Sequence, residues 1–441
     1  MRFRSLAAVV AGVLMVALAA PAAAASAQVG SAALAEQVAR QVLPAGDGWA
    51  AEGTGTTGGA AAAPENVFYV HDRDELAAAV AGTTPAIVFV RGTILGNADA
   101  SGAPLSCAQF ADPAYTLDAF LAAYDPAVWG RVAPSGPLEE ARVRSAANQS
   151  ARVRVNVGSN KTIIGVRGAR LNGVFLRLDG SANVIIRNLT HEDSRDCFPV
   201  WSPTDGETGN WNAAYDNIWV RNSQHVWVDH NTFTDADNPD SAQPLYFGRP
   251  YQVHDGQTDI TNGSNYVTVS YNRYTNHDKT MLIGSTNTPG VDVGALKVTV
   301  HHNEFDGTVQ RAPRVRFGQV DVYNNLYRVP VADPFEYSWG VGVQSAIYAE
   351  NNYLALGAGV SPDAIVFDWG GTVLTEKGTW VRSGRSLPRP TNLLAAYNAT
   401  HDPDIAADAG WTPTLRAGPV LPAPAAALVV ELCAGARRLP I

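Results

Sequence analysis

Acidic side chains with the chemistry of hard-metal ligands occur near the middle of this 441-residue chain. Asp255 and Asp259 lie in the segment H-D-G-Q-T-D at residues 254–259, and Asp216 lies upstream as a candidate third acid. Calcium binds through oxygen atoms, and carboxylates supply both the oxygens and the charge. The three aspartates are therefore candidate ligands of a calcium ion.

Basic side chains follow the acids in the next two segments. Lys279 closes H-D-K at residues 277–279, and Arg311 and Arg316 belong to R-A-P-R-V-R-F-G at residues 311–318. Arginine grips carboxylates as a planar fork, and lysine acts on them as a point charge. Taken singly, such residues are more often solvated or paired surface charges. Together, a metal held by acids beside a basic cluster indicates chemistry on a polyanion.

The elements that must position these side chains form a repeat from residue 153 onward. Short β-branched runs end in a turn near an asparagine, in the pattern apolar-x-apolar-x-x-Asn-x-apolar. The starts of the clear copies are unevenly spaced, which indicates a solenoid in which one loop per coil varies in length. The copies are residues 226–233, 267–274, 298–305, 320–327, more weakly 347–354 and, more loosely, 183–190.

Strands with aligned asparagines predict a parallel β-helix. The amides would stack as a ladder at one turn, apolar residues would stack inside, and the variable loops would build a binding groove. A β-sandwich with coincidental asparagine turns is the alternative, but it requires clearer two-residue hairpin signals than this sequence contains. The fold class is therefore predicted as an all-β solenoid.

The N-terminal part of the chain divides into processing and structural segments. Arg2 and Arg4 precede an apolar run that ends in A-S-A, which is typical of a secretory signal cleaved after residue 27. We assign residues 1–27 to a signal peptide, 28–47 to an N-terminal segment and 48–441 to one β-helix catalytic domain. Strands are expected at 67–70 and 87–94, a short helix at 72–80, and a helical excursion between about 98 and 150.

Composition limits the partners of the mature protein. The net charge is −9 and becomes more negative once the two signal arginines are removed, which argues against nucleic-acid binding. No other apolar stretch is long enough to cross a bilayer, so a secreted, extracellular monomer without a membrane partner is expected. Cys107, Cys197 and Cys433 allow one disulfide, and the sequence does not say which pair forms.

Several segments, taken together, resemble the secreted pectate lyases of polysaccharide lyase family 1. They are V-W-V-D-H at residues 226–230, the three segments of the acidic and basic cluster, and residues 196–212, all in the family's order. The resemblance spans roughly residues 48 to 415 and implies a right-handed parallel β-helix. It also implies calcium-dependent β-elimination on α-1,4-linked polygalacturonate, giving 4,5-unsaturated products.

The resemblance also implies roles for single residues. Asp216, Asp255 and Asp259 match the calcium-binding acids, and Arg311 matches the catalytic base. Lys279 and Arg316 match the residues that bind substrate carboxylates. The low-complexity tail at residues 422–433 has no counterpart that we can identify.

Arg311 is an unusual base, because guanidinium normally stays protonated. Neighbouring cations are expected to lower its pKa. Charge reasoning alone would have selected Lys279 as the base, so the role of Arg311 rests on the resemblance.

Three alternatives remain at this stage. A pectin lyase would act on methyl-esterified polymer without calcium, which the three aspartates and Lys279 disfavour. A β-helix polygalacturonase would hydrolyse with closely placed carboxylates, and this chain lacks the Asp-Asp and Gly-His-Gly segments of such enzymes. A non-catalytic carbohydrate-binding β-helix would have no use for an intact Arg311.

Overall fold

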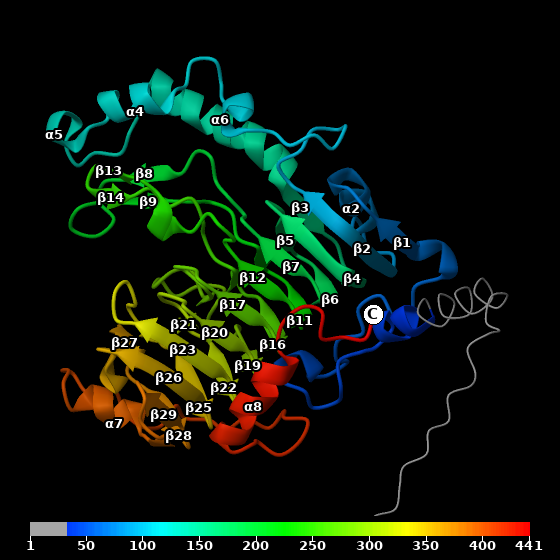
Figure 1. The fold of residues 1–441 in the computed structure, drawn as a ribbon, viewed down its shortest axis with the longest axis vertical. Helices are drawn as coiled ribbons and strands as arrows, with labels where there is room; N and C mark the ends of the chain where they lie inside the picture. Colours follow the sequence, from blue (N-terminus) through cyan, green and yellow to red (C-terminus); the bar gives the residue numbers. More distant parts are fainter. Residues whose placement is uncertain (1–32) are drawn as a thin grey trace, which may run out of the picture.

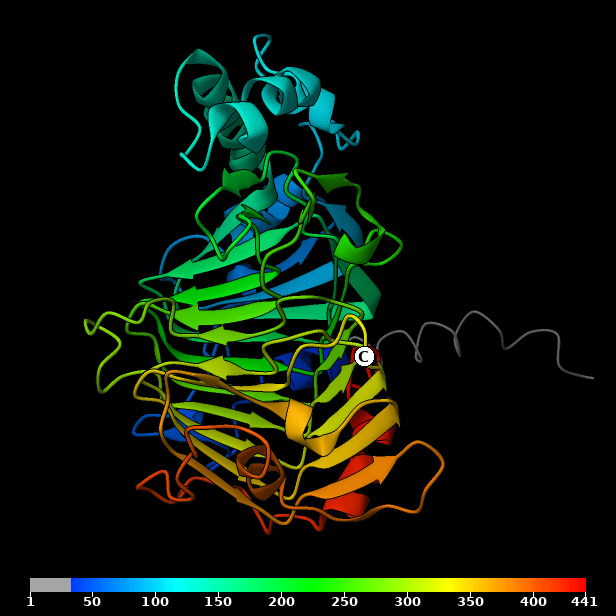
Figure 2. The same ribbon diagram turned by 90° about the vertical axis from the view of Figure 1, so that its left-hand side faces the viewer.

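The computed structural model describes residues 33–441 and shows a stack of three-strand coils (Figures 1 and 2). The predicted signal peptide lies outside the described residues. Nearly all strand pairs are parallel, and each strand pairs with its counterpart in the next coil. The predicted right-handed parallel β-helix is confirmed. None of the helices in the described residues is both long enough and apolar enough to cross a bilayer.

One face of the stack is an eight-stranded parallel sheet, and this sheet carries the candidate site. Its strands are short, so each coil contributes only a few outward-pointing side chains. In spatial order they are β3 (Arg154–Val157), β5 (Phe175–Asp179), β10 (Ile218–Arg221), β15 (Thr258–Thr261), β18 (Leu282–Ile283), β21 (Arg314–Val315), β24 (Trp339–Gly342) and β27 (Val366–Trp369).

The other two faces form one 18-stranded sheet, because the long strands β2 (Ala86–Leu95) and β4 (Lys161–Asn172) span both of them. The first of these faces contains β1 (Val67–Val70), β6 (Ala182–Arg187), β11 (Gln224–Asp229), β16 (Asn265–Ser270), β19 (Val298–His301), β22 (Gln319–Tyr323), β25 (Ala346–Glu350) and β28 (Leu374–Lys377). The second contains β7 (Thr190–Glu192), β12 (Thr232–Thr234), β17 (Arg273–Thr275), β20 (Glu304–Asp306), β23 (Leu326–Val331), β26 (Tyr353–Ala358), β29 (Trp380–Ser383) and β30 (Arg389–Pro390).

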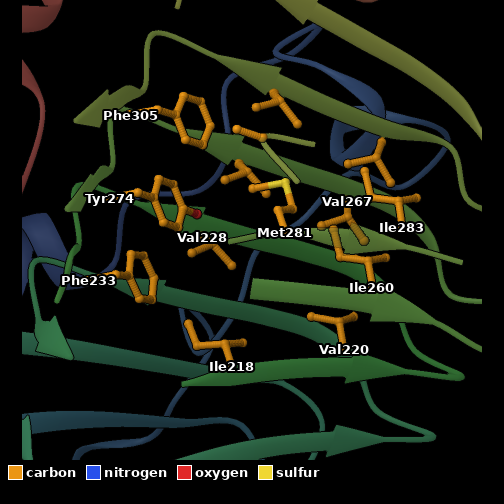
Figure 3. Packing of buried hydrophobic residues seen from close by; sticks show 14 of the residues in the cluster. Ile218, Val220, Val228, Phe233, Ile260, Val267, Tyr274, Met281, Ile283 and Phe305 are labelled. Atoms are coloured by element: carbon orange, nitrogen blue, oxygen red, sulfur yellow. The ribbon is translucent and has the colours of Figure 1, made fainter. Parts of the chain in front are cut away.

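The core runs along the axis of the stack as columns of like side chains (Figure 3). Aromatic rings at equivalent positions of successive coils stack nearly parallel, with centroids 4.7 Å apart for Phe233 and Tyr274 and 5.0 Å apart for Tyr274 and Phe305. This distance matches the spacing of parallel strands, about 4.8 Å. The β-branched repeats form strands because each inward side chain meets its counterpart in the neighbouring coil.

The predicted asparagine ladder is confirmed at the turn between the two faces of the 18-stranded sheet. From Asn272 onward, each amide oxygen accepts from the backbone N–H and the side-chain Nδ2 of the asparagine one coil earlier. Asn303 Oδ1, for example, accepts from Asn272 N at 2.9 Å and Asn272 Nδ2 at 3.0 Å. Five buried asparagines take part: Asn231, Asn272, Asn303, Asn325 and Asn352.

The predicted helical excursion is also present, and it projects from one end of the stack (Figure 1). Its helices surround an aromatic core of their own, separate from the axial columns. The Cys107–Cys197 disulfide, with Cα atoms 5.4 Å apart, ties it to the loop before β8 (Val200–Ser202), and Cys433 is free. The helices are α3 (Cys107–Phe110), α4 (Leu117–Ala123), α5 (Pro126–Trp129) and α6 (Pro137–Val153).

The C-terminal tail, which the sequence did not place, packs along the outside of the stack. Helix α8 (Ala423–Cys433) buries Val430 against Leu326, and Ala436 N then donates to Thr232 Oγ1 at 3.0 Å. The expected helix near residue 72 is α2 (Arg73–Ala79), capped by the Asp72 carboxylate. Three further short elements are β9 (Asn210–Asn212), β13 (Leu245–Tyr246) and β14 (Arg249–Pro250).

Candidate active site

The six predicted site residues come from four successive coils on the face of the eight-stranded sheet. Asp216 precedes β10, Asp255 precedes β15, and Asp259 lies within β15. Lys279 precedes β18, and Arg311 and Arg316 lie on either side of β21. Because parallel strands lie about 4.8 Å apart, residues from adjacent coils are close in space although 20 to 40 positions separate them in the chain.

Two of the three aspartates converge on one glycine. A Cβ added at Gly256 would lie 2.2 Å from Asp259 Oδ1 and 2.8 Å from Asp216 Oδ1, so only a glycine leaves room there. The N–H of Gly256 donates to Asp216 Oδ1 at 2.8 Å, and that of Leu282 donates to Asp259 Oδ1 at 2.9 Å. Backbone donors therefore fix both carboxylates in place, and both side chains are buried.

The electrostatics of this pair suit a divalent cation. Burial first, and then the charges of Asp259 and Asp255, raise the pKa of Asp216 well above its usual range. Burial and the charge of Asp255 likewise raise the pKa of Asp259 to about 7. Such carboxylates are ionised only at a cost, and a bound hard cation would remove that cost.

The structure brings the three acids together only in part. Within residues 33–441, no three carboxylate, imidazole or thiolate side chains are close enough to enclose a metal by themselves. Asp216 and Asp259 form the cradle, and Asp255 contributes its charge from the adjacent turn. Calcium takes six to eight oxygen ligands, so the donor set fits that ion if substrate and water oxygens complete it.

The predicted substrate-binding cations differ in their surroundings. Arg316 is already oriented, because its Nε donates to Asn287 Oδ1 at 2.6 Å and its Nη1 donates to the Gly284 carbonyl at 2.8 Å. Lys279 is 6 % exposed, and its backbone forms a bridge with Gln310 in the next coil. Both side chains are held close to the sheet before any substrate binds.

Arg311 sits in a strained and half-buried position. Its φ is +60°, in the left-handed region that costs a bulky residue about 1–3 kcal/mol. Its Nε is buried without a hydrogen-bond partner, and no carboxylate of the described residues lies within ion-pair distance of its guanidinium. Strain and an unpaired donor together indicate a functional residue.

The expected direction of the Arg311 pKa shift is wrong. Burial does lower this pKa, but the charges of Asp255 and Asp259 outweigh it, and the pKa is raised above its ordinary value. The expected lowering occurs in the other arginines of the segment: burial and Arg311 lower the pKa of Arg316. The sequence shows that other cations lie near Arg311 in the chain, but not that Asp255 and Asp259 lie close to it in the fold.

Sequence reasoning missed a buried histidine network behind the acids. His277 places Nδ1 2.9 Å from the Asp235 carboxylate and Nε2 2.7 Å from the Asp255 carbonyl oxygen. Both partners are acceptors, so both ring nitrogens must donate and the imidazole is a cation. His254 lies in the same way between Asp193 and Asp240. The only signal in the sequence was the histidine that begins each of the segments at 254 and 277.

Comparisons with known proteins identify the family of the chain. The family model described as pectate lyase matches residues 4–118 and 133–386. The chain is 45 % identical to a pectate lyase of Bacillus subtilis (strain 168) over 390 residues, which cover 87 % of this chain and 90 % of that protein. It is 35 % identical to pectate lyase D of Dickeya chrysanthemi over 378 residues, 82 % of this chain and 85 % of the relative.

Solved structures give the same result. A thermostable pectate lyase superposes with a TM-score of 0.89 and 44 % identity, covering 91 % of this chain and 99 % of that one. A pectate lyase bound to a hexasaccharide superposes with a TM-score of 0.85, again at 44 % identity and with the same coverage.

Proposed function

This chain belongs to the pectate lyase family and cleaves pectate, and we propose that it does so by calcium-dependent β-elimination at the site around Gly256 and Arg311. The observation that supports this proposal is the placement of a two-carboxylate cradle beside three buried or half-buried cations. A hydrolase would instead need an acid and a base flanking the glycosidic bond.

The reaction removes the proton on C5 of a galacturonate unit, which is α to the C6 carboxylate. Asp216 and Asp259, with the charge of Asp255 beside them, would hold the calcium ion, which would supply positive charge at the C6 carboxylate. Lys279 and Arg316 hold substrate carboxylates against the sheet. Arg311 in its neutral form accepts the C5 proton and becomes a guanidinium, the C–H electron pair becomes the C4–C5 double bond, and the C4–O bond breaks, with its oxygen taking a proton from water. The guanidinium then returns its proton to the hydroxide that remains.

The position of Arg311 agrees with this role. Asp255 and Asp259 are the charges that raise its pKa, and they are also proposed metal ligands. A cation bound to these acids would offset the charges that raise the Arg311 pKa and leave burial, which lowers it. Metal binding at these acids would therefore favour the neutral form of Arg311, and no further group is needed for this effect.

Assays on two polymers test the proposal. Absorbance of the unsaturated product should appear on polygalacturonate, disappear in chelator and return when calcium is added back. Activity confined to methyl-esterified pectin, or unaffected by chelator, would identify a pectin lyase instead. Binding without any product would identify a non-catalytic β-helix.

We further propose that the enzyme acts outside the cell as a monomer, after removal of residues 1–27. The Cys107–Cys197 disulfide supports an oxidising compartment. Sequencing the N-terminus of protein recovered from culture medium should begin at Gln28. Protein retained in the cells with an intact N-terminus would refute export.

A further inference from the structure

Arg314 is a cation of the eight-stranded sheet that the proposed machinery does not use. Val315 is buried in the core, so the alternation of strand β21 turns Arg314 outward. Ile260 pairs with Ile283, and Leu282 pairs with Arg314. Arg314 therefore occupies the same outward row as Asp259, two strands and roughly 10 Å further along the stack.

The guanidinium of Arg314 lies on an aromatic platform. Its Cζ is 3.8 Å from the ring centroid of Trp369, whose ring is 4.9 Å from Phe367 and 6.0 Å from Tyr337. Stacking of this kind fixes the plane of an arginine while leaving its N–H groups pointing outward. The side chain is therefore oriented before any ligand arrives.

Space for this arrangement depends on Gly340. Gly340 pairs with Arg314 in register, and a Cβ there would lie 2.9 Å from Arg314 Cγ and 2.8 Å from Tyr337 Cε2. Any larger residue would push the arginine off its platform.

Arg314 lacks the carboxylate partner that a half-buried arginine normally has. In residues 33–441 no carboxylate lies within 4.0 Å of it, and its Nε is buried without a hydrogen bond. Burial first, and then the charges of Arg316 and Arg311, lower its pKa to about 10. The local excess of positive charge would be relieved by an anion, and a planar carboxylate matches the fork of a guanidinium.

We propose that Arg314 binds the carboxylate of a second galacturonate unit, further along the polymer from the unit beside Arg311, and thereby requires that unit to be unesterified. This inference rests on the proposed function of the site. A methyl ester at that unit would remove the negative charge and one acceptor oxygen. Arg314 then acts as a specificity-determining residue that directs the enzyme to runs of free carboxylates.

Kinetics of Arg314→Gln on two substrates test the assignment. On polygalacturonate we expect KM to rise about tenfold with kcat within twofold, because a charge-assisted hydrogen bond to a bound carboxylate is lost. On partly methyl-esterified pectin the rise should be smaller, so that the preference for the free polymer falls severalfold. Arg382→Gln, on β29 of the 18-stranded sheet, is the matched control and should change neither value.

Two further measurements exclude a structural explanation. Arg314→Lys keeps the charge without the fork, so it should recover part of the lost preference. Thermal unfolding should show a Tm within a few degrees of the wild type for both variants. An unchanged KM and preference in Arg314→Gln, or a lower Tm with the kinetics intact, would overturn the proposal.

Direct binding separates this inference from the proposed function. Calorimetry with trigalacturonate and longer oligogalacturonates needs no turnover, so the contribution of Arg314 is measurable even if the wild type forms no unsaturated product. Weaker binding of the longer oligomers by Arg314→Gln supports the inference whatever the reaction is. Equal binding by variant and wild type refutes it even if lyase activity is present.

Discussion

The asparagine ladder and the candidate active site both bury polar groups on the same coils, but they treat them in opposite ways. Asn303 uses both of its amide groups: Oδ1 accepts two hydrogen bonds, and Nδ2 donates to Asn325 Oδ1 at 3.1 Å and to the Val269 carbonyl at 2.9 Å. In the active site, two buried carboxylates repel each other and Arg311 has no partner for its Nε.

The difference indicates that the polar groups of the ladder stabilise the fold, whereas those of the active site serve the reaction. A satisfied buried hydrogen bond contributes about 1 kcal/mol, whereas an unsatisfied buried group costs about 1–3 kcal/mol. The ladder should therefore matter for unfolding and not for turnover. The active site should matter for turnover and add little to stability.

Arg311→Lys carries the largest expected effect. A shorter, differently shaped cation cannot occupy the position of the proposed base, so kcat on polygalacturonate should fall about 100- to 10,000-fold. Binding of polygalacturonate, measured by calorimetry, should stay within a few-fold, and circular dichroism should match the wild type. A near-normal kcat would make Arg311 a substrate clamp and Lys279 the leading candidate for the base.

Asp229→Asn tests a buried ion pair on the ladder side. Arg187 Nη2 donates to Asp229 Oδ2 at 2.6 Å, and Ser270 Oγ donates to Oδ1 at 3.0 Å. At pH 7 the variant leaves a buried guanidinium unpaired, so the free energy of unfolding should fall by about 3 kcal/mol with kcat unchanged.

The pH dependence of that loss follows from the Asp229 pKa. Burial raises this pKa, but His230 and Arg187 outweigh it and hold it at about 2, below the unfolded value. The stabilisation is then complete above about pH 4 and is lost as pH falls toward 2. Denaturant titrations should show the variant and the wild type converging over that range. A constant difference between pH 5 and pH 2 would contradict the assignment.

Asn303→Ala tests the ladder itself. The change removes Asn303 Oδ1, the acceptor of two hydrogen bonds from Asn272, and leaves both Asn272 N–H donors buried without that acceptor. We therefore expect a loss of about 2–3 kcal/mol in unfolding free energy. Asn148→Ala is the comparison, since Asn148 makes one side-chain hydrogen bond, to the Phe110 carbonyl at 3.0 Å, and should cost about 1 kcal/mol. Equal losses in the two variants would show that the ladder adds nothing beyond single bonds.

Lys279→Ala should reduce kcat/KM by roughly 30-fold, which corresponds to about 2 kcal/mol. The loss should be shared between kcat and KM, because the lysine holds a carboxylate in the ground state as well as in the transition state. Steady-state rates on polygalacturonate at saturating calcium measure both. A change in kcat alone would give Lys279 a role confined to the transition state.

The ladder was predictable because its signal is local. One asparagine at a fixed position after two alternating apolar residues marks each coil, and the structure places the four clear copies and the weaker one at residues 347–354 in register. The same holds for part of the helical excursion, since Thr116 caps α4 and apolar residues recur along that helix at helical spacing. Such patterns can be recognised from neighbouring residues in the chain, without knowledge of the tertiary contacts.

The rest of the active site depends on distant neighbours. The pKa of Arg311 is set by acids that precede it by more than 50 positions, and His277 and Arg314 gain their roles from Asp235 and Trp369. The pairing of Cys107 with Cys197 likewise depends on how the excursion folds back. Pairing of strands from different coils brings these groups together, and no local periodicity in the sequence reveals these contacts.

Asp259→Asn, followed by thermal unfolding at pH 8 with and without calcium, tests the contrast most directly. Above a pKa of about 7 the wild-type carboxylate is ionised against its environment, so removing its charge should leave the metal-free protein at least as stable as the wild type. The wild type should gain several degrees in Tm with calcium, whereas the variant should gain little and lose lyase activity. A metal-free variant less stable than the wild type, or one that keeps the full calcium-induced rise in Tm, would contradict the account.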